Sequence, residues 1–197
     1  MDNQTLIYIC GPHTAGKTSI LKILKDDSTI DFTGGEIGKE LYYERLLKTE
    51  EQNEDFELEV TQRELERDSF IFRQKFKNSV VESWHVGNLA YAMVRNPHSI
   101  EKLVTLINTS PFLQRSYGIW LRVSAENIIK RTKTFSKDKE WAAEFYTRID
   151  SKMESCFQTL NLSGYCVVDA NRDFDIIMKD VYNIIQLKIK EQLCQYI

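Results

Sequence analysis

The sequence lacks the clustered cysteines and histidines that a zinc site would need. It contains four cysteines and three histidines in 197 residues, and no two cysteines form a C-x-x-C pair. Cys10 and Cys166 lie in segments that we predict to be buried strands, so we expect reduced core thiols there. We therefore do not expect zinc chemistry.

Long apolar runs and basic blocks are missing as well. No run approaches the roughly 20 apolar residues of a membrane span, and the first residues lack the basic region of a signal peptide. The formal net charge is −3, and no basic block stands out for contacts with a phosphate backbone. We expect a cytoplasmic protein that binds neither a membrane nor a nucleic-acid polymer.

One motif dominates what is present. Gly11 to Thr18, GPHTAGKT, fits the phosphate-binding pattern G-x-x-x-x-G-K-[ST]. Residues 6–10 before it are apolar and predict a buried strand, and residues 19–25 after it have apolar positions at helical spacing. The glycines let the backbone turn its N–H groups toward phosphate oxygens, and the following helix adds the positive end of its dipole. The sequence therefore predicts a site for a nucleoside triphosphate.

The side chains of this loop have separate predicted roles. Lys17 supplies a mobile positive charge for the β- and γ-phosphates, and the Thr18 hydroxyl is a ligand for Mg²⁺. We therefore expect ATP and Mg²⁺ as cofactors. The residues predicted to bind the nucleotide are Gly11, His13, Thr14, Ala15, Gly16, Lys17, Thr18 and Ser19.

Five short apolar segments alternate with helical segments along the chain. The predicted strands are 6–10, 28–33, 79–85, 117–123 and 165–170. This alternation predicts an α/β fold in three layers, with a five-stranded parallel sheet covered by helices on both faces. No linker, repeat or low-complexity stretch interrupts it, so we expect one domain over residues 1–197. Ligands of such sheets bind beyond the carboxyl ends of the strands.

Acidic residues at those strand ends are candidates for chemistry. Glu82 follows Val80-Val81 directly and could act as general base or magnesium ligand, or could be a structural acid near Lys17. Asp31 and Glu36 compete for the acceptor side, with turn capping as the alternative role. His85 is a candidate on the substrate side.

Basic residues fall in two places. Arg67 and Arg73 could hold a phosphate of the acceptor, although their spacing of six residues does not put both on one helical face. Residues 131–140 form a polar segment between two helices and predict a mobile lid over the phosphates. Arg131 would be its catalytic charge clamp, and a solvated loop is the alternative.

The order of these parts resembles the P-loop nucleoside and nucleotide kinases, most closely the thymidylate kinase branch. GPHTAGKT matches their phosphate loop, residues 32–38 are similar to the Gly-Gly-containing loop after the second strand, and residues 65–68 are similar to the arginine-bearing substrate helix. The resemblance covers nearly the whole chain. It implies a P-loop kinase fold, with Asn88 among the substrate-side residues and Arg131 as the lid arginine.

Two departures from that family stand out. The variable positions of the phosphate loop carry no acid, and Glu82-Ser83 occupies the place of an Asp-Arg pair whose arginine contacts phosphate. We therefore expect ATP-dependent phosphoryl transfer to a small acceptor, either a thymidylate-like nucleoside monophosphate or a nucleoside. A kinase of a non-nucleotide metabolite is an alternative within the same mechanism.

A second alternative is a nucleotide-binding switch or assembly module without transfer activity. Asp31 to Gly34 matches the D-x-x-G element of GTPases, but it begins thirteen residues after Thr18, which leaves no room for a switch segment. No N-K-x-D guanine signature occurs in the chain. The sequence leaves the oligomeric state open, a homodimer included.

Overall fold

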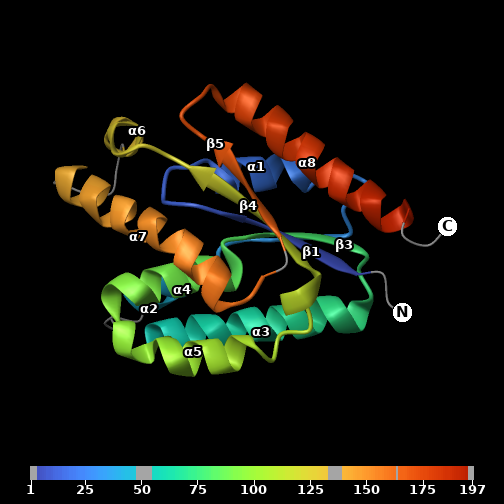
Figure 1. Cartoon of the computed structure of the whole chain (residues 1–197), viewed down its shortest axis with the longest axis horizontal. Coiled ribbons are helices and arrows are strands. Elements are labelled where there is room, and N and C mark those ends of the chain that lie inside the picture. Colours follow the sequence, from blue (N-terminus) through green and yellow to red (C-terminus); the bar gives the residue numbers. More distant parts are fainter. Residues whose placement is uncertain (1–3, 48–54, 133–138, 163, 195–197) are drawn as a thin grey trace.

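The computed structural model describes residues 4–47, 55–132, 139–162 and 164–194. In this part of the chain, five parallel strands form one sheet in the order β2-β3-β1-β4-β5 (Figure 1). The strands are β1 Thr5–Cys10, β2 Phe32–Gly34, β3 Asn78–Glu82, β4 Ser116–Arg122 and β5 Tyr165–Asp169. The predicted three-layer α/β fold is confirmed.

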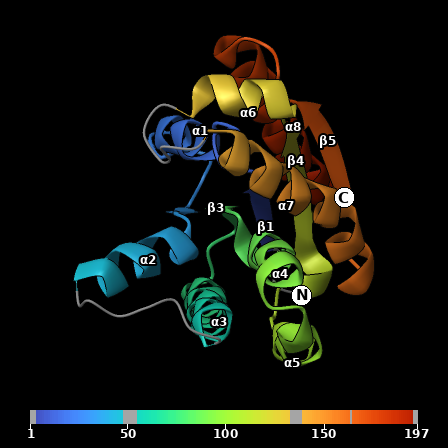
Figure 2. The same cartoon turned by 90° about the vertical axis from the view of Figure 1, so that its left-hand side faces the viewer.

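Helices cover both faces of the sheet (Figures 1 and 2). One face packs against α1 and α8, and the other against α3, α4, α5 and α7. The helices are α1 Lys17–Leu24, α2 Ile37–Leu47, α3 Phe56–Gln74, α4 Trp84–Arg95, α5 Ile100–Ile107, α6 Ala125–Arg131, α7 Lys139–Thr159 and α8 Phe174–Cys194. Short 3₁₀ turns occupy Pro97–Ser99 and Leu113–Arg115.

The two cores follow from the alternation of side chains along the central strand. In β1, Leu6, Tyr8 and Cys10 face the cluster formed with α3, α4 and α7. Ile7 and Ile9 face the opposite cluster with α1 and α8. A strand buried on both faces requires the continuous apolar run that the sequence has there.

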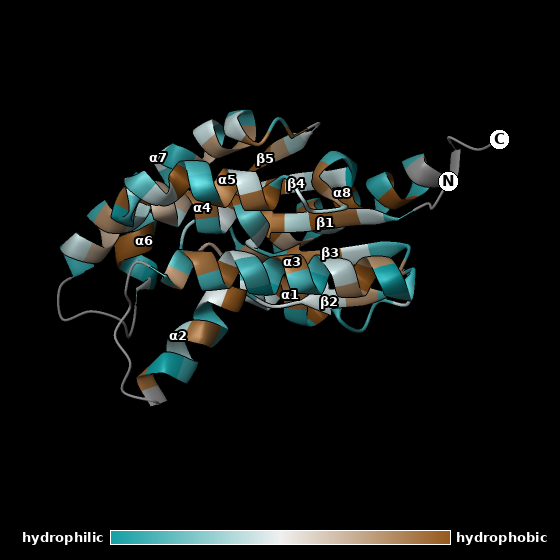
Figure 3. Ribbon diagram, turned by 90° about the horizontal axis from the view of Figure 1, so that it is seen from below, coloured by the Kyte–Doolittle hydropathy of each residue, from teal (hydrophilic) through white to brown (hydrophobic). Residues whose placement is uncertain are grey.

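Helix α2 extends away from the sheet (Figures 2 and 3). It contacts α3 through a small separate cluster of Ile37, Leu41, Phe56 and Val60. Residues 48–54, between α2 and α3, lie outside the described residues. No helix among the described residues has the length and apolar character needed to cross a membrane.

Two predicted strands have different ends in the structure. The segment 28–33 contributes β2 from Phe32 onward, because the Asp31 carboxylate accepts hydrogen bonds from the backbone N–H groups of Lys77 (2.7 Å) and Asn78 (2.9 Å) at the start of β3. The segment 79–85 ends as a strand at Glu82. Ser83 and Trp84 have φ angles of 64° and 51°, and this turn leads directly into α4.

Candidate active site

The phosphate loop joins β1 to α1 with a backbone that requires glycine at its first position. Gly11 has a φ of 138°, and a Cβ atom built on it would lie 2.3 Å from the carbonyl oxygen of Leu121 in β4. Gly16 caps α1 with a φ of 99°. Residues that carry a Cβ atom rarely adopt these φ angles. The loop therefore has the close backbone packing that its sequence pattern predicted.

Lys17 is folded over this loop and is 5% exposed. Its Nζ donates hydrogen bonds to the carbonyl oxygens of Gly11 (3.0 Å) and Pro12 (3.2 Å). A cavity of about 240 Å³ opens beside it, which we call the phosphate cavity. It is lined by His13, Thr14, Gly16, Lys17, Thr18, Ser19, Glu36, Lys39, Glu82 and Arg131. The structure thus brings most of the predicted nucleotide-side residues together.

Thr18 and Glu82 form a hard-oxygen pair in this cavity. The Thr18 hydroxyl lies 2.8 and 3.0 Å from the two Glu82 carboxylate oxygens. Burial raises the pKa of Glu82, while the Lys17 charge and the Thr18 hydrogen bond lower it part of the way back. A hydroxyl and a carboxylate suit Mg²⁺, which takes few ligands from protein and the rest from phosphates and water. No cluster of three or more acidic, His or Cys side chains that could hold a metal ion occurs among the described residues.

Arg131 ends α6 and lines the phosphate cavity. Its Nη2 lies 3.4 Å from the carbonyl oxygen of Arg172, in the connection between β5 and α8. Arg131 therefore lines the same cavity as the residues of the phosphate loop. Residues 133–138 of the predicted lid lie outside the described residues.

A larger cavity, of about 570 Å³, adjoins the phosphate cavity between α2, α3, α4 and α7. We call it the aromatic cavity. Its rings come from several elements, and two contacts are close to parallel: Trp141 on Phe145 (5.2 Å, 5°) and His13 on Tyr146 (5.3 Å, 26°). The aromatic lining consists of Tyr42, Tyr43, Phe56, Tyr91, Trp141, Phe145 and Tyr146. Its size and lining suit a flat organic ligand.

The polar lining of the aromatic cavity includes two carboxylates, Glu36 and Glu64, and the cations Lys39 and Arg95. Arg95 is compensated, because its Nη2 pairs with Glu57 at 2.9 Å and its guanidinium group lies 4.9 Å from the Tyr91 ring centroid. Among the described residues, Lys39 is therefore the lining cation left without an ion pair, against two carboxylates.

Asn88 and Glu36 are the predicted substrate residues that line the aromatic cavity. The Asn88 amide donates hydrogen bonds to the Glu57 carbonyl oxygen (2.9 Å) and the Thr61 hydroxyl (2.8 Å), so α3 holds its orientation. Glu36 precedes α2 and lines the phosphate cavity as well. Together they span the aromatic cavity from α4 to the loop after β2.

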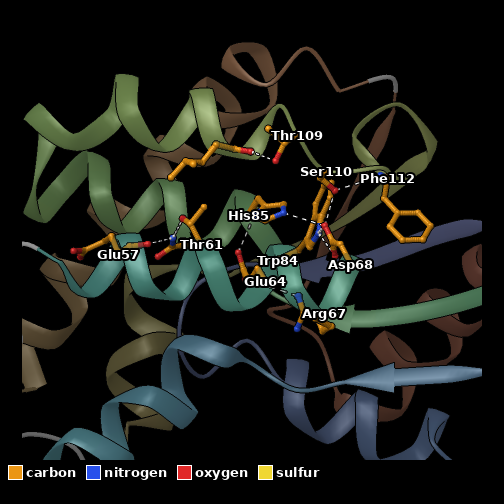
Figure 4. A network of polar contacts seen from close by, with 12 residues as sticks. Glu57, Thr61, Glu64, Arg67, Asp68, Trp84, His85, Thr109, Ser110 and Phe112 are labelled. Atoms are coloured by element: carbon orange, nitrogen blue, oxygen red, sulfur yellow. Dashed lines mark hydrogen bonds and ion pairs between the residues drawn. The ribbon is translucent and has the colours of Figure 1, made fainter. Parts of the chain in front are cut away.

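His85 does not line the aromatic cavity, although Glu64 does, and both belong to the network of polar contacts in Figure 4. It is fully buried between two carboxylates of α3: its Nε2 is 3.1 Å from Asp68 Oδ2, and its Nδ1 is 3.0 Å from Glu64 Oε2. The second contact is an ion pair whose angles do not fit a hydrogen bond. Burial alone would lower the pKa of His85, but the two carboxylates outweigh it and raise the pKa to about 9. His85 thus contacts Glu64, which lines the aromatic cavity, and its place on the substrate side stays a prediction.

Asp68 is the centre of this network, with no exposed surface. Besides His85, it accepts hydrogen bonds from Trp84 Nε1 (3.1 and 3.2 Å) and the Ser110 hydroxyl. Burial raises the pKa of Asp68, but His85, Arg67 and Ser110 outweigh burial and hold it below its ordinary value. The carboxylate therefore stays ionised and ties α3 to the turn after β3.

The other predicted substrate-binding residues, Arg67, Arg73 and Asp31, line neither cavity. Arg67 donates a hydrogen bond from Nη1 to the Gly35 carbonyl oxygen (2.9 Å) and so anchors the loop before Glu36. Arg73 is exposed near the end of α3 and bonds to the Ser69 carbonyl oxygen. Asp31 lies at the amino end of β2, the opposite edge of the sheet from the phosphate loop. Asp31 and Arg73 are thus outside both cavities.

Sequence reasoning missed Lys39, Glu64 and the aromatic residues of α2 and α7. The spacing of Glu36, Lys39 and Tyr43 by three and four residues was a usable signal, because such positions share one face of a helix. The contribution of α7 had no local signal, since it depends on how that helix packs beside α4.

A phosphate loop at the carboxyl edge of a parallel sheet in the order 2-3-1-4-5, beside a second ligand-sized cavity, defines a P-loop kinase fold. Comparison of structures agrees. A deoxyadenosine kinase from M. mycoides with the products dCMP and a flexible dCDP bound has a TM-score of 0.62, at 18% identity over 92% of this chain and 99% of its own. The YorR protein of Bacillus subtilis, in complex with phosphorylated GDP, has a TM-score of 0.58, at 19% identity over 93% of this chain and 97% of its own.

No family model and no curated protein sequence matches the chain. The two structural neighbours confirm the expected resemblance to P-loop nucleoside and nucleotide kinases at the level of the fold.

Proposed function

We propose that the protein is a phosphotransferase that moves the γ-phosphoryl group of ATP to a hydroxyl group of a nucleoside. One observation carries this proposal: the phosphate cavity and the aromatic cavity adjoin, and His13, Glu36 and Lys39 line both. Adjoining sites hold two reactants in the alignment that phosphoryl transfer needs. The nucleotides bound to the two structural neighbours support a nucleoside-like acceptor.

The charges favour a nucleoside over a monophosphate such as thymidylate. Ser83 follows Glu82 in the turn after β3 and brings no cation, and Arg95 is compensated by Glu57. Arg67 donates from Nη1 to the Gly35 carbonyl oxygen, its Nη2 lies 3.9 Å from Glu64 Oε1, and it does not line the aromatic cavity. A phosphate dianion there would face the carboxylates of Glu36 and Glu64, with Lys39 as the uncompensated cation of the described lining, whereas a neutral sugar and a flat base suit this lining.

On the donor side, the roles follow from position. The loop N–H groups and Lys17 would bind the β- and γ-phosphates, and Arg131 would approach from α6. Thr18 and Glu82 would hold Mg²⁺, which neutralises phosphate charge when bound. Both oxygens of Glu82 are directed at Thr18, and this supports a metal-side role for Glu82 over that of general base.

Glu36 is the better candidate for the base. It lines both cavities, so its carboxylate can reach an acceptor hydroxyl placed between them. As the acceptor oxygen bonds to the γ-phosphorus, the bond to the bridging oxygen of ADP breaks, and the hydroxyl proton passes to Glu36. A well-placed base of this kind contributes about 10²–10⁴-fold to the rate.

The test measures ADP release with ATP and Mg²⁺ against a panel of nucleosides, nucleoside monophosphates and small hydroxylated metabolites, with product masses checked. We expect nucleoside-dependent turnover and a product heavier by one phosphoryl group. Glu36→Gln should lower kcat about 10²-fold or more with unchanged ATP affinity. Glu66→Gln, on the exposed side of α3 and outside both cavities, is the matched control.

Other outcomes would contradict the proposal in identifiable ways. Turnover with monophosphates alone would overturn the nucleoside assignment and restore the thymidylate-like alternative. Turnover of a non-nucleotide metabolite would replace the acceptor class. Slow ATP loss that no acceptor stimulates would favour a switch or assembly module.

A further inference from the structure

Lys39 is a lysine of α2 that lies between the two cavities. It lines the phosphate cavity and the aromatic cavity, as Glu36 does three residues before it. Within the described part of the chain, its ammonium group forms neither a hydrogen bond nor an ion pair. An unpaired ammonium group at the junction of two ligand-sized cavities is available to a ligand.

The charge of Lys39 acts on groups of the phosphate loop and of β3. Burial lowers the pKa of His13 to about 4, and the charges of Lys17 and Lys39 add to this lowering. The same charge opposes the burial-driven rise in the pKa of Glu82. Lys39 therefore contributes to the potential at the place where the terminal phosphate of a bound nucleotide would lie.

The other cations near this junction are already assigned. Lys17 belongs to the phosphate loop, and Arg131 approaches from the nucleotide side. Arg95, which lines the aromatic cavity, pairs with Glu57 of α3. A phosphoryl group in flight spreads its negative charge over three oxygens, and it needs cations on the acceptor side as well as the donor side.

We propose that Lys39 is a catalytic residue that binds the phosphoryl group during its transfer. This inference rests on the proposed function and adds a residue to it. The Lys39 ammonium stays protonated throughout: the acceptor oxygen gains the phosphorus, the electron pair of the broken bond remains on ADP, and Glu36 takes the hydroxyl proton. The base thus directly precedes α2, and the acceptor-side cation lies three residues further on, in the first turn of that helix.

The test compares Lys39→Gln and Lys39→Arg with the wild-type protein. We expect Lys39→Gln to lower kcat about 100-fold while the KM for the acceptor changes little, because the contact strengthens in the transition state. Lys39→Arg keeps the charge and should recover most of the rate. Lys102→Gln is the matched control, because Lys102 is an exposed lysine of α5 that lines neither cavity.

A binding measurement separates this inference from the proposed function. Calorimetry with Mg²⁺ needs no acceptor: Lys39→Gln should weaken binding of the non-hydrolysable analogue AMP-PNP about tenfold and leave ADP binding unchanged. Wild-type kcat in Lys39→Gln would overturn the catalytic role even if the wild-type enzyme is a nucleoside kinase. If the wild-type protein transfers to no acceptor, an unchanged ratio of AMP-PNP to ADP affinity would overturn the phosphoryl contact by itself.

Discussion

The buried His85 should make the protein less stable as the pH rises above about 6.5. In the folded state the carboxylates of Glu64 and Asp68 raise its pKa from 6.5 to about 9. In the unfolded chain the imidazole returns to its ordinary pKa, so unfolding releases a proton between these two pH values. The stabilisation is fully present below pH 6.5 and is lost as the pH approaches 9.

The size of the effect follows from the shift. One pKa unit corresponds to about 1.4 kcal/mol, so the full difference is about 3 kcal/mol. Between pH 6.5 and 8.5 the free energy of unfolding should fall by about 2 kcal/mol, because the titration has begun at one limit and is incomplete at the other. This is a large part of the stability of an ordinary domain.

The assay is urea denaturation at several pH values from 6.5 to 8.5, for the wild-type protein and for His85→Gln. Burial also raises the pKa of Cys10 well above its ordinary value and that of Cys156 to about 12, so ionisation of these thiols in the unfolded chain lowers the free energy of unfolding further at higher pH. The variant carries the same thiols and corrects for them. Equal pH slopes in the two proteins would refute the reasoning.

If His85→Gln is too unstable to measure, the imidazole resonance of His85 provides the answer in the wild-type protein. We expect the ring to remain protonated at pH 8. A ring that titrates near pH 6.5 would contradict the role that we assign to Glu64 and Asp68.

Two further predictions concern the phosphate loop. Glu82→Gln should keep the fold but raise the Mg²⁺ concentration needed for half-maximal turnover, because one magnesium ligand is lost. A magnesium titration that matches the wild type would contradict the metal-side role. Gly11→Ala should lower the free energy of unfolding by more than about 2 kcal/mol, because its Cβ would meet the Leu121 carbonyl oxygen at 2.3 Å. The control in the same denaturation assay is Gly38→Ala in α2, where a Cβ meets Val60 at 3.8 Å.

The phosphate loop could be predicted from sequence because its determinants are local. Strand, glycines, Lys17 and helix follow one another in the chain, and each is required by the geometry of the others. The layered sheet was predictable for a similar reason, since strands buried on both faces must be continuously apolar. We predicted Asp31 at the carboxyl end of a strand because the apolar Ile30 and Phe32 flank it. Its carboxylate instead accepts hydrogen bonds from the backbone N–H groups of Lys77 and Asn78, 46 and 47 residues further along the chain, at the amino end of the sheet.

The position of His85 could not be inferred from its neighbours in the chain. Ser83 and Trp84 adopt positive φ angles that residues other than glycine seldom take, so nothing local indicated that the strand stops at Glu82. Lys39 and Glu64 were missed because their importance depends on where α2 and α3 stand relative to the phosphate loop. Such positions are set by packing between helices.

The network around Asp68 explains how the unfavourable turn after Glu82 is kept. Two successive residues with positive φ cost on the order of 1–3 kcal/mol each. Asp68 offsets this cost by accepting hydrogen bonds from the Trp84 indole and the His85 ring, which both belong to the turn or its first helical residues. An ionised carboxylate makes such bonds stronger, and the proton on His85 keeps Asp68 ionised although it is buried. The protonated His85 ring therefore stabilises both the core and the turn at the end of β3, where Glu82 accepts the hydrogen bond of the Thr18 hydroxyl.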